Sequence, residues 1–176
     1  ITQNKIKGKA KAMVVTASRL HAVRYLQEFR NYIEKMGYTD MDVLVAFSGS
    51  LNVDEEEVTE TKLNKTKDGR HISEDQLPEE FHGDNFNVLI VAEKYQTGFD
   101  EPLLHTMFVD KKLKNVKAVQ TLSRLNRTCS GKKDTFILDF VNTAEEIQTA
   151  FAPYYEETSL DREIDVNMIY DQKNKL

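Results

Sequence analysis

Two arginines three residues apart, Arg124 and Arg127, are the side chains of this sequence whose type and spacing could do chemistry. On a helix, positions i and i+3 lie on one face, so both guanidiniums would project the same way, with Gln120 one turn before Arg124. Arginine stays charged at any working pH, and its planar fork matches phosphate oxygens. The pair could therefore neutralise charge on a phosphoryl group during its transfer. Spacing alone favours ordinary surface arginines bonded to carboxylates.

The sequence before these arginines favours the phosphate-binding interpretation over ordinary surface arginines. An apolar run of strand length, Asn87–Ala92, leads into a polar turn with a glycine and a proline, Glu93–Pro102. A second strand-like run, His105–Asp110, precedes the segment Gln120–Arg127. Strand, loop, strand and arginine helix form an arrangement suited to handling phosphate charge.

The elements that must position these residues follow from hydrophobic pattern and from turn and cap residues. Strands alternating with helices predict parallel β-α-β units with right-handed crossovers, and functional loops at the carboxyl ends of the strands. Helices are expected after Ser18 as N-cap, from Ser73 to Phe81, from Val116 to Asn126 and after Thr143. The sequence predicts strands at Ala12–Ala17, Asp42–Phe47, Asn87–Ala92, Thr106–Val109 and Thr135–Phe140.

Two short patterns carry a resemblance to a known family. The loop Thr97–Pro102 and the pattern Gln120-x-x-Ser123-Arg124-x-Asn126-Arg127 resemble motifs V and VI of superfamily 2 helicases and translocases, although motif VI more often has glycines at the positions of Ser123 and Asn126. The run Asn87–Asn142 is most similar to the restriction (R) subunit of type I restriction-modification enzymes. The resemblance covers roughly Lys11 to Thr158, and its telling stretches are residues 97–107, 123–127, 137–142 and 150–155.

The resemblance implies an α/β fold with a mainly parallel five- to six-stranded sheet flanked by helices, as in the second RecA-like motor domain of an ATP-dependent DNA translocase. The expected organisation is a linker at residues 1–10, the motor domain at 11–158 and a tail or linker to a missing domain at 159–176. Residues 51–70 are expected to form a mobile excursion, because they are polar and show little apolar pattern.

By resemblance, Arg124 and Arg127 would be the catalytic arginine fingers, and three further residues would contact ATP. Gly98 would let the main chain approach its ligand closely. Asp100 would hold the ribose or brace an arginine, and Gln120 would help to orient the phosphate site. Single polar residues in loops also have ordinary structural explanations.

DNA contacts are expected where strands end. Ser18 and Arg19 follow the first strand, where the family touches a nucleic-acid phosphate or the nucleotide; a simple helix cap and a solvated arginine explain them as well. Ser48 and Gly49 follow the second strand, where a turn of small residues can bring N–H groups near an anion or can be an ordinary tight turn. Thr97 would contact the DNA backbone.

The full-length enzyme implied by the resemblance is an ATP-dependent type I site-specific deoxyribonuclease that uses ATP and Mg²⁺. Its partners would be double-stranded DNA, the first RecA-like domain of the same chain, and methyltransferase and specificity subunits. A cytoplasmic protein without membrane contact is expected, since no apolar run approaches the roughly 18–20 residues of a membrane span and the single cysteine, Cys129, leaves no intramolecular disulfide.

Composition sets further bounds. The chain has 176 residues, enough for one domain, and 40% hydrophobic content, enough for a core. Its net charge of −5 argues against a broadly basic nucleic-acid coat and favours a local groove with few phosphate contacts. The acidic block Asp54–Glu57 lacks ordered spacing, so we expect it to face solvent and predict no metal site.

Other functions remain open at this point. A different superfamily 2 helicase or translocase is one, which the run Phe99–His105 disfavours. A non-catalytic DNA or protein interaction module built from a decayed motor domain is another, which the intact arginines disfavour. A nucleotide-binding metabolic domain would need a glycine-rich fingerprint after the first strand, and this sequence has none.

The isolated chain should have no ATPase activity, with or without duplex DNA. It contains no Gly-xxxx-Gly-Lys-Ser/Thr phosphate loop, no acidic Mg²⁺-binding motif to partner such a loop, and no nuclease motif. The measurement is steady-state phosphate release by the purified chain. Turnover that survives repurification and disappears in Arg124→Ala would contradict the expectation.

Overall fold

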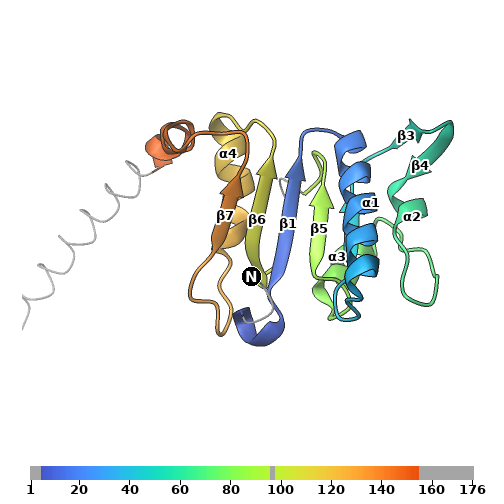
Figure 1. Ribbon diagram of the computed structural model, residues 1–176. Helices are drawn as coiled ribbons and strands as arrows, with labels where there is room; N and C mark the ends of the chain where they lie inside the picture. Colours follow the sequence, from blue (N-terminus) through green and yellow to red (C-terminus); the bar gives the residue numbers. More distant parts are fainter. Residues whose placement is uncertain (1–4, 96–97, 155–176) are drawn as a thin grey trace, which may run out of the picture.

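A five-stranded, all-parallel sheet forms the centre of the protein in the computed structural model, which describes residues 5–95 and 98–154 (Figure 1). The strand order is β2-β5-β1-β6-β7, and every neighbouring pair is parallel. This confirms the predicted mainly parallel sheet of five or six strands, and all five predicted runs form strands with ends within two residues of those expected. The strands are β1 (Lys11–Thr16), β2 (Val43–Ala46), β5 (Val88–Val91), β6 (Leu104–Asp110) and β7 (Phe136–Asp139).

Burial on both faces explains why these strands are nearly continuous apolar runs. Every residue of β1, β2 and β5 is buried. Alternate side chains of β1 enter different cores: Met13 and Val15 face one, and Ala12 and Val14 face the other. The edge strand β7 differs, because Phe136, Ile137 and Leu138 keep about 40% of their surface exposed.

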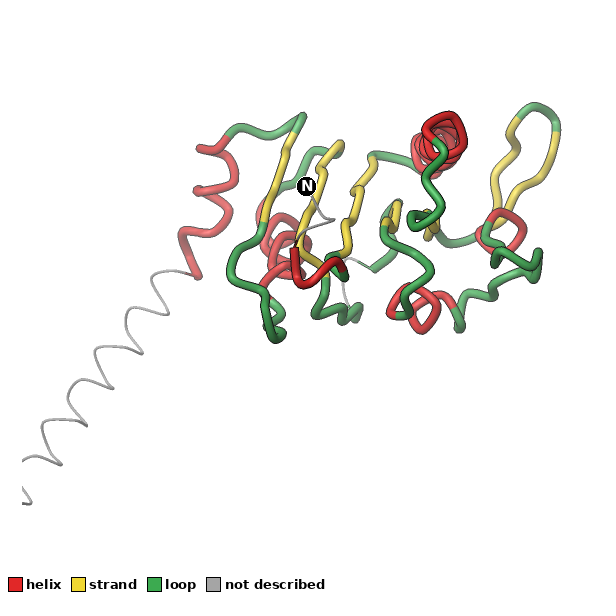
Figure 2. Tube along the Cα trace, turned by 60° about the horizontal axis from the view of Figure 1, so that its bottom comes forward, coloured by secondary structure: helices red, strands yellow, loops and turns green. Residues whose placement is uncertain are grey.

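Helices lie on both faces of the sheet, with α1 (Arg19–Met36) on one side and α3 (Leu77–His82) and α4 (Asn115–Leu122) on the other (Figure 2). Residues 144–154 are also helical and pack on the α4 side through Ala150 and the half-buried Ile147 and Phe151. None of the helices in the described ranges is long and apolar enough to cross a membrane.

The expected caps of two helices are confirmed. The Ser18 hydroxyl accepts a hydrogen bond from the backbone N–H of His21 at 3.2 Å, and Gly37 ends α1 in the left-handed conformation. Before residue 144, the Thr143 N–H donates to Glu146 Oε2 at 2.9 Å and the Glu146 N–H donates to Thr143 Oγ1 at 3.3 Å, which is a reciprocal capping box.

The segment expected to be an excursion has more structure than its polar sequence indicates. β3 (Ser50–Val53) and β4 (Glu56–Thr59) form an antiparallel hairpin that lies beyond α1, and α2 (Glu60–Leu63) follows it (Figure 1). The buried Asn64 side chain accepts from the Val45 N–H at 2.9 Å and donates to the Val45 carbonyl at 2.7 Å. Its amide thus satisfies the free edge of β2 as a neighbouring strand would, and such polar docking leaves no hydrophobic period to detect.

Two further expectations need correction. The start of the chain includes a 3-10 helix, η1 (Lys5–Gly8), with Ile6 buried, so the second half of the expected linker packs on the domain. The helix expected from Ser73 begins only at Leu77, because Ser73–Gln76 forms a turn. The expected tail at residues 159–176 lies outside the described residues, and the mobility of residues 51–70 stays a prediction.

Candidate functional site

The arginines lie at the amino edge of the sheet, where the strands begin. Because β6 and β7 are parallel, the chain between them must return from the carboxyl edge, and α4 makes that return (Figure 1). The chain between β5 and β6 makes the same return, so Phe99–Pro102 also approaches the start of β6 at the amino edge. The parallel topology therefore brings the loop Phe99–Pro102 next to the segment that carries Arg124 and Arg127.

Direct contacts join the arginines to that loop. Arg124 Nη1 donates to the Phe99 carbonyl at 2.9 Å. Arg127 Nε lies 3.0 Å from Asp100 Oδ1, in an ion pair whose side chains are 52% and 68% exposed. Arg127 and Asp100 are therefore open to solvent, whereas Arg124 is half-buried and not a plain surface residue.

The backbone that carries the arginines differs from the expected α-helix. α4 ends at Leu122, and a 3-10 helix, η2 (Ser123–Asn126), follows it. Arg127 caps η2 with an extended backbone at φ −68° and ψ 130°. A 3-10 helix has three residues per turn and aligns positions i and i+3 more closely than an α-helix does. The expected α-helical face is wrong in detail, but the two arginines still meet the same loop.

Electrostatics make this corner receptive to an anion. Burial lowers the pKa of Arg124, the nearby Arg127 charge acts in the same direction, and Asp100 opposes both. Arginine remains protonated under these influences, because a guanidinium keeps its charge at any working pH. Arg124 and Arg127 place two guanidiniums at this corner beside the exposed Asp100, and their forks can bind phosphate oxygens.

The other two residues predicted to contact ATP are Gly98 and Gln120. Gly98 has φ +75°, a conformation that side chains rarely adopt, while a Cβ added there would meet no atom within 4 Å. Glycine is therefore required for its backbone conformation, not for a close approach within this chain. Gln120 is exposed on α4, one turn before Arg124.

A second group of predicted residues lies at the carboxyl edge, opposite the arginines. A pocket of about 510 Å³ opens there, where β1, β2 and β5 end. Arg19 Nη1 lies across the turn after β2 and donates to the carbonyls of Ser48 at 3.2 Å and Ser50 at 2.8 Å. The structure thus brings together Ser18, Arg19, Ser48 and Gly49, whereas Thr97 lies outside the described residues. The pocket is lined by Ala17, Ser18, Arg19, Ser48, Ala92 and Glu93.

Glu93, which sequence reasoning missed, supplies negative charge to the rim of this pocket. Its carboxylate pairs with Lys111 Nζ at 3.1 Å, and the hydrogen bond from Lys111 is the main cause of its lowered pKa. The Glu93 backbone has φ +59°, an uncommon conformation for a residue with a side chain. Lys111 therefore offsets a carboxylate that would otherwise repel phosphate.

A buried ion pair also escaped sequence reasoning, and it braces this edge. Lys94 Nζ lies 2.9 Å from Glu60 Oε2 and 2.7 Å from Glu74 Oε2. The 1%-exposed Glu60 carboxylate also accepts from the Phe47 N–H at 2.8 Å. Burial raises the pKa of Glu60, while Lys94 and the Phe47 N–H act against that rise. The network ties the end of β2 to the residue that follows Glu93.

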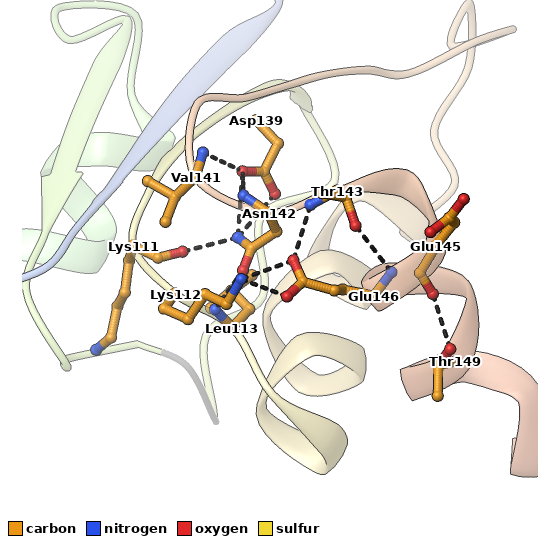
Figure 3. A network of polar contacts seen from close by, with 10 residues as sticks. All are labelled: Lys111, Lys112, Leu113, Asp139, Val141, Asn142, Thr143, Glu145, Glu146 and Thr149. Carbon is orange, nitrogen blue, oxygen red and sulfur yellow. Dashed lines mark hydrogen bonds and ion pairs between the residues drawn. The ribbon is translucent and has the colours of Figure 1, made fainter.

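Asn142 fastens the loops after β6 and β7 to each other (Figure 3). Its side chain donates to the Lys111 carbonyl at 2.8 Å and accepts from the Leu113 N–H at 2.9 Å. Asp139 Oδ1 accepts the N–H groups of Val141 and Asn142, and Lys112 pairs with Glu146 at 2.5 Å. An asparagine just past a strand was the only sequence signal for this junction.

Metal ligands do not gather in the part of the chain that is described. Within residues 5–95 and 98–154, no group of three or more His, Cys, Asp or Glu side chains could hold a metal ion.

The structure thus defines a parallel α/β domain with one polar or basic site at each edge of its sheet. Comparison with known proteins identifies its relatives: residues 70–145 match the family described as type I restriction enzyme subunit R domain 3. The chain is a relative of type I restriction enzyme R subunits, and residues 70–145 correspond to domain 3 of that subunit.

Individual relatives agree with this placement. Two proteins of Methanocaldococcus jannaschii, named as the MjaIXP and MjaVIIP endonuclease subunits of type I restriction enzymes, are 29% and 33% identical over 94% and 83% of this chain. The chain spans only 15% and 14% of their lengths. Among solved structures, the C-terminal domain of the DEAD-box protein Dbp5 aligns with a TM-score of 0.45 and 14% identity, over 81% of this chain and 70% of that one.

Gly49→Ala tests whether the Arg19 hydrogen bonds hold the turn after β2. Gly49 and Gly69 have φ of +77° and +86°, so alanine at either position should cost about 1–2 kcal/mol of strain. A Cβ at Gly49 would also lie 3.2 Å from Arg19 Nη1, whereas one at Gly69 would meet nothing. We expect Gly49→Ala to cost about 0.5–1 kcal/mol more in urea unfolding, through weakened Arg19 hydrogen bonds.

The control is the same comparison in an Arg19→Ala background, where the excess should vanish. Equal destabilisation by the two alanines in the parent chain would show that Arg19 does not hold the turn.

Proposed function

We propose that this chain is the second motor domain of the ATP-dependent DNA translocase in a type I restriction enzyme R subunit. The observation that carries the proposal is the meeting of Phe99 and Asp100 with Arg124 and Arg127 at one corner of the domain. The similarity to R subunits also supports the proposal. Two guanidiniums beside an exposed carboxylate suit a phosphoryl-transfer site that another domain completes.

The donor set fits the phosphate end of a nucleotide. Arg127 and Asp100 are exposed and paired with each other, so Arg127 can exchange its carboxylate for a phosphate oxygen at little desolvation cost. Arg124 is held by a carbonyl and keeps its charge beside Arg127. ATP, when bound, supplies the phosphoanhydride whose hydrolysis drives movement. Within the described residues, no group of three or more His, Cys, Asp or Glu side chains could hold a metal ion, and we assign metal and triphosphate binding to the first RecA-like domain.

The carboxyl edge is the proposed DNA path. The Ser48–Gly49–Ser50 turn, the Ser18 cap and Arg19 are small or basic groups that a phosphate backbone can approach. Arg19 bonds the carbonyls of the turn through Nη1, and the other nitrogens of its exposed guanidinium can donate to a phosphate. Such a site makes few contacts, in keeping with the net charge of −5.

In the full-length enzyme, we place this domain next to the first RecA-like domain of the same chain, with double-stranded DNA across both. Methyltransferase and specificity subunits would complete the restriction complex, and DNA cleavage would belong to a separate nuclease domain. Closure of the two motor domains would bring the arginines to the nucleotide, and reopening after hydrolysis would advance the DNA.

Loss of either arginine should remove ATP-driven translocation by the full-length enzyme while ATP binding persists. A well-placed arginine finger contributes roughly 10³–10⁵ in rate, so Arg124→Ala and Arg127→Ala should lower kcat by about that range. Lysine should rescue poorly, because an ammonium cannot reproduce the planar fork. Arg124→Ala should also cost about 1 kcal/mol of stability, because it leaves the Phe99 carbonyl without this donor.

Arg70 provides the matched control, because it is an exposed arginine bonded to a carboxylate, Glu80, at 2.7 Å. Arg70→Ala should leave kcat unchanged. If both test variants keep kcat within a few-fold of the parent, the arginines are ordinary surface residues and a non-catalytic interaction module becomes the better assignment.

A negative charge at the carboxyl edge should weaken duplex DNA binding by the chain itself. Ser48→Glu should cost about 1 kcal/mol, or roughly fivefold in affinity, by repulsion from phosphate. Log K should fall with log salt at about −0.9 per phosphate contact. Ser130→Glu, an exposed site in the loop before β7 at the amino edge, is the control of equal charge. Equal effects of both variants in fluorescence anisotropy would place the DNA elsewhere.

A further inference from the structure

Lys132 links the two segments that build the arginine corner. Its ammonium donates to the Leu125 and Arg127 carbonyls, each at 2.7 Å, and to the Pro102 carbonyl at 3.3 Å. Two of these acceptors belong to the arginine segment, and the third belongs to the loop that holds Asp100. One side chain therefore bridges the segment and the loop without using either arginine.

The loop end of this bridge is firmly held. Phe99 is buried, with its ring 4.7 Å from that of Tyr95 and 6.0 Å from that of Phe81. The buried Glu101 accepts from the Leu103 N–H at 2.9 Å and lies 3.1 Å from His82 Nδ1. The loop thus offers a fixed base, and what must be positioned on it is the arginine segment.

The arginines cannot do that positioning alone during a reaction cycle. The contacts of Arg124 with Phe99 and of Arg127 with Asp100 use the same guanidiniums that the proposed function assigns to phosphate. Whenever those groups turn to a nucleotide, their own links to the loop weaken. The bonds from Lys132 run to main-chain carbonyls and do not depend on where the guanidiniums point.

We propose that Lys132 is a positioning residue for the arginine pair, holding the Leu125–Arg127 backbone against the Asp100 loop while the guanidiniums exchange partners. The inference rests on the proposed function of the arginines. A compact ammonium with three donors suits three converging carbonyls, whereas the larger, planar guanidinium of arginine does not. Burial lowers the pKa of Lys132, while the nearby Cys129 and Glu101 act in the opposite direction.

The test is Lys132→Met in the full-length R subunit assembled with its partner subunits, with ATP turnover and ATP affinity measured separately on DNA. A misplaced catalytic group can cost about 10²-fold, so kcat should fall roughly 10- to 100-fold while the Kd for ATP stays within about threefold. Lys132→Arg should restore little. The adjacent Lys133→Met, an exposed lysine that bonds to none of the three carbonyls, removes the same charge and should leave kcat at the parent value.

Each outcome has a distinct meaning when the assays are run below the unfolding temperature of every variant. If Lys132→Met lowers the unfolding temperature but keeps the parental kcat, Lys132 is merely structural and the inference fails. If Lys133→Met loses as much kcat, positive charge in this loop matters and not the three Lys132 hydrogen bonds, and the inference again fails. If Arg124→Ala and Arg127→Ala themselves keep kcat, the proposed function fails first. If only the two arginine variants lose kcat, the positioning role of Lys132 alone is wrong.

Discussion

Parallel pairing of the five strands is the constraint on which the rest of this structure depends. A parallel strand can be followed by its neighbour only if the chain returns to the starting edge, so every crossover delivers residues from one edge to the other. The loop after β5 and the segment after β6 both make that return beside β6. Their meeting at the amino edge joins Asp100 to Arg127 and Phe99 to Arg124. The carboxyl ends of β1, β2 and β5 gather the other polar group.

The sheet thereby separates two tasks that the proposed motor domain must couple. Phosphate charge would be handled at one edge and the DNA backbone at the other, with rigid buried strands between them. A close-packed core transmits displacement, because it has few voids to absorb it. The connections at both edges are braced by buried or half-buried polar groups: Glu60 and Lys94 at one, and Glu101 and Lys132 at the other.

Such polar braces explain where sequence reasoning stopped. Asn64 docks the hairpin segment on β2 through two hydrogen bonds, and Glu60 is buried although it belongs to a stretch of charged residues. The sequence around each residue shows no apolar periodicity, and an isolated Asn or Glu in a polar stretch normally faces solvent. Burial becomes favourable only because the β2 edge and the Phe47 N–H need partners, and that need arises only after the sheet has formed.

The sequence alone determined the strands, their parallel arrangement, the caps at Ser18 and Thr143, and the likeness of residues 87–142 to R subunits. Those features depend on local apolar runs, cap chemistry and short motifs, all of which are written in neighbouring residues. Only the tertiary structure decided that Arg124 and Arg127 meet Phe99 and Asp100 at the amino edge, that the arginine segment ends as a 3-10 helix, and that Lys132 bridges the two segments. The reason is physical: the contacts of Arg124, Arg127 and Lys132 with residues 99–102 join groups far apart along the chain, and the strand order, which no local pattern encodes, brings them within hydrogen-bonding distance.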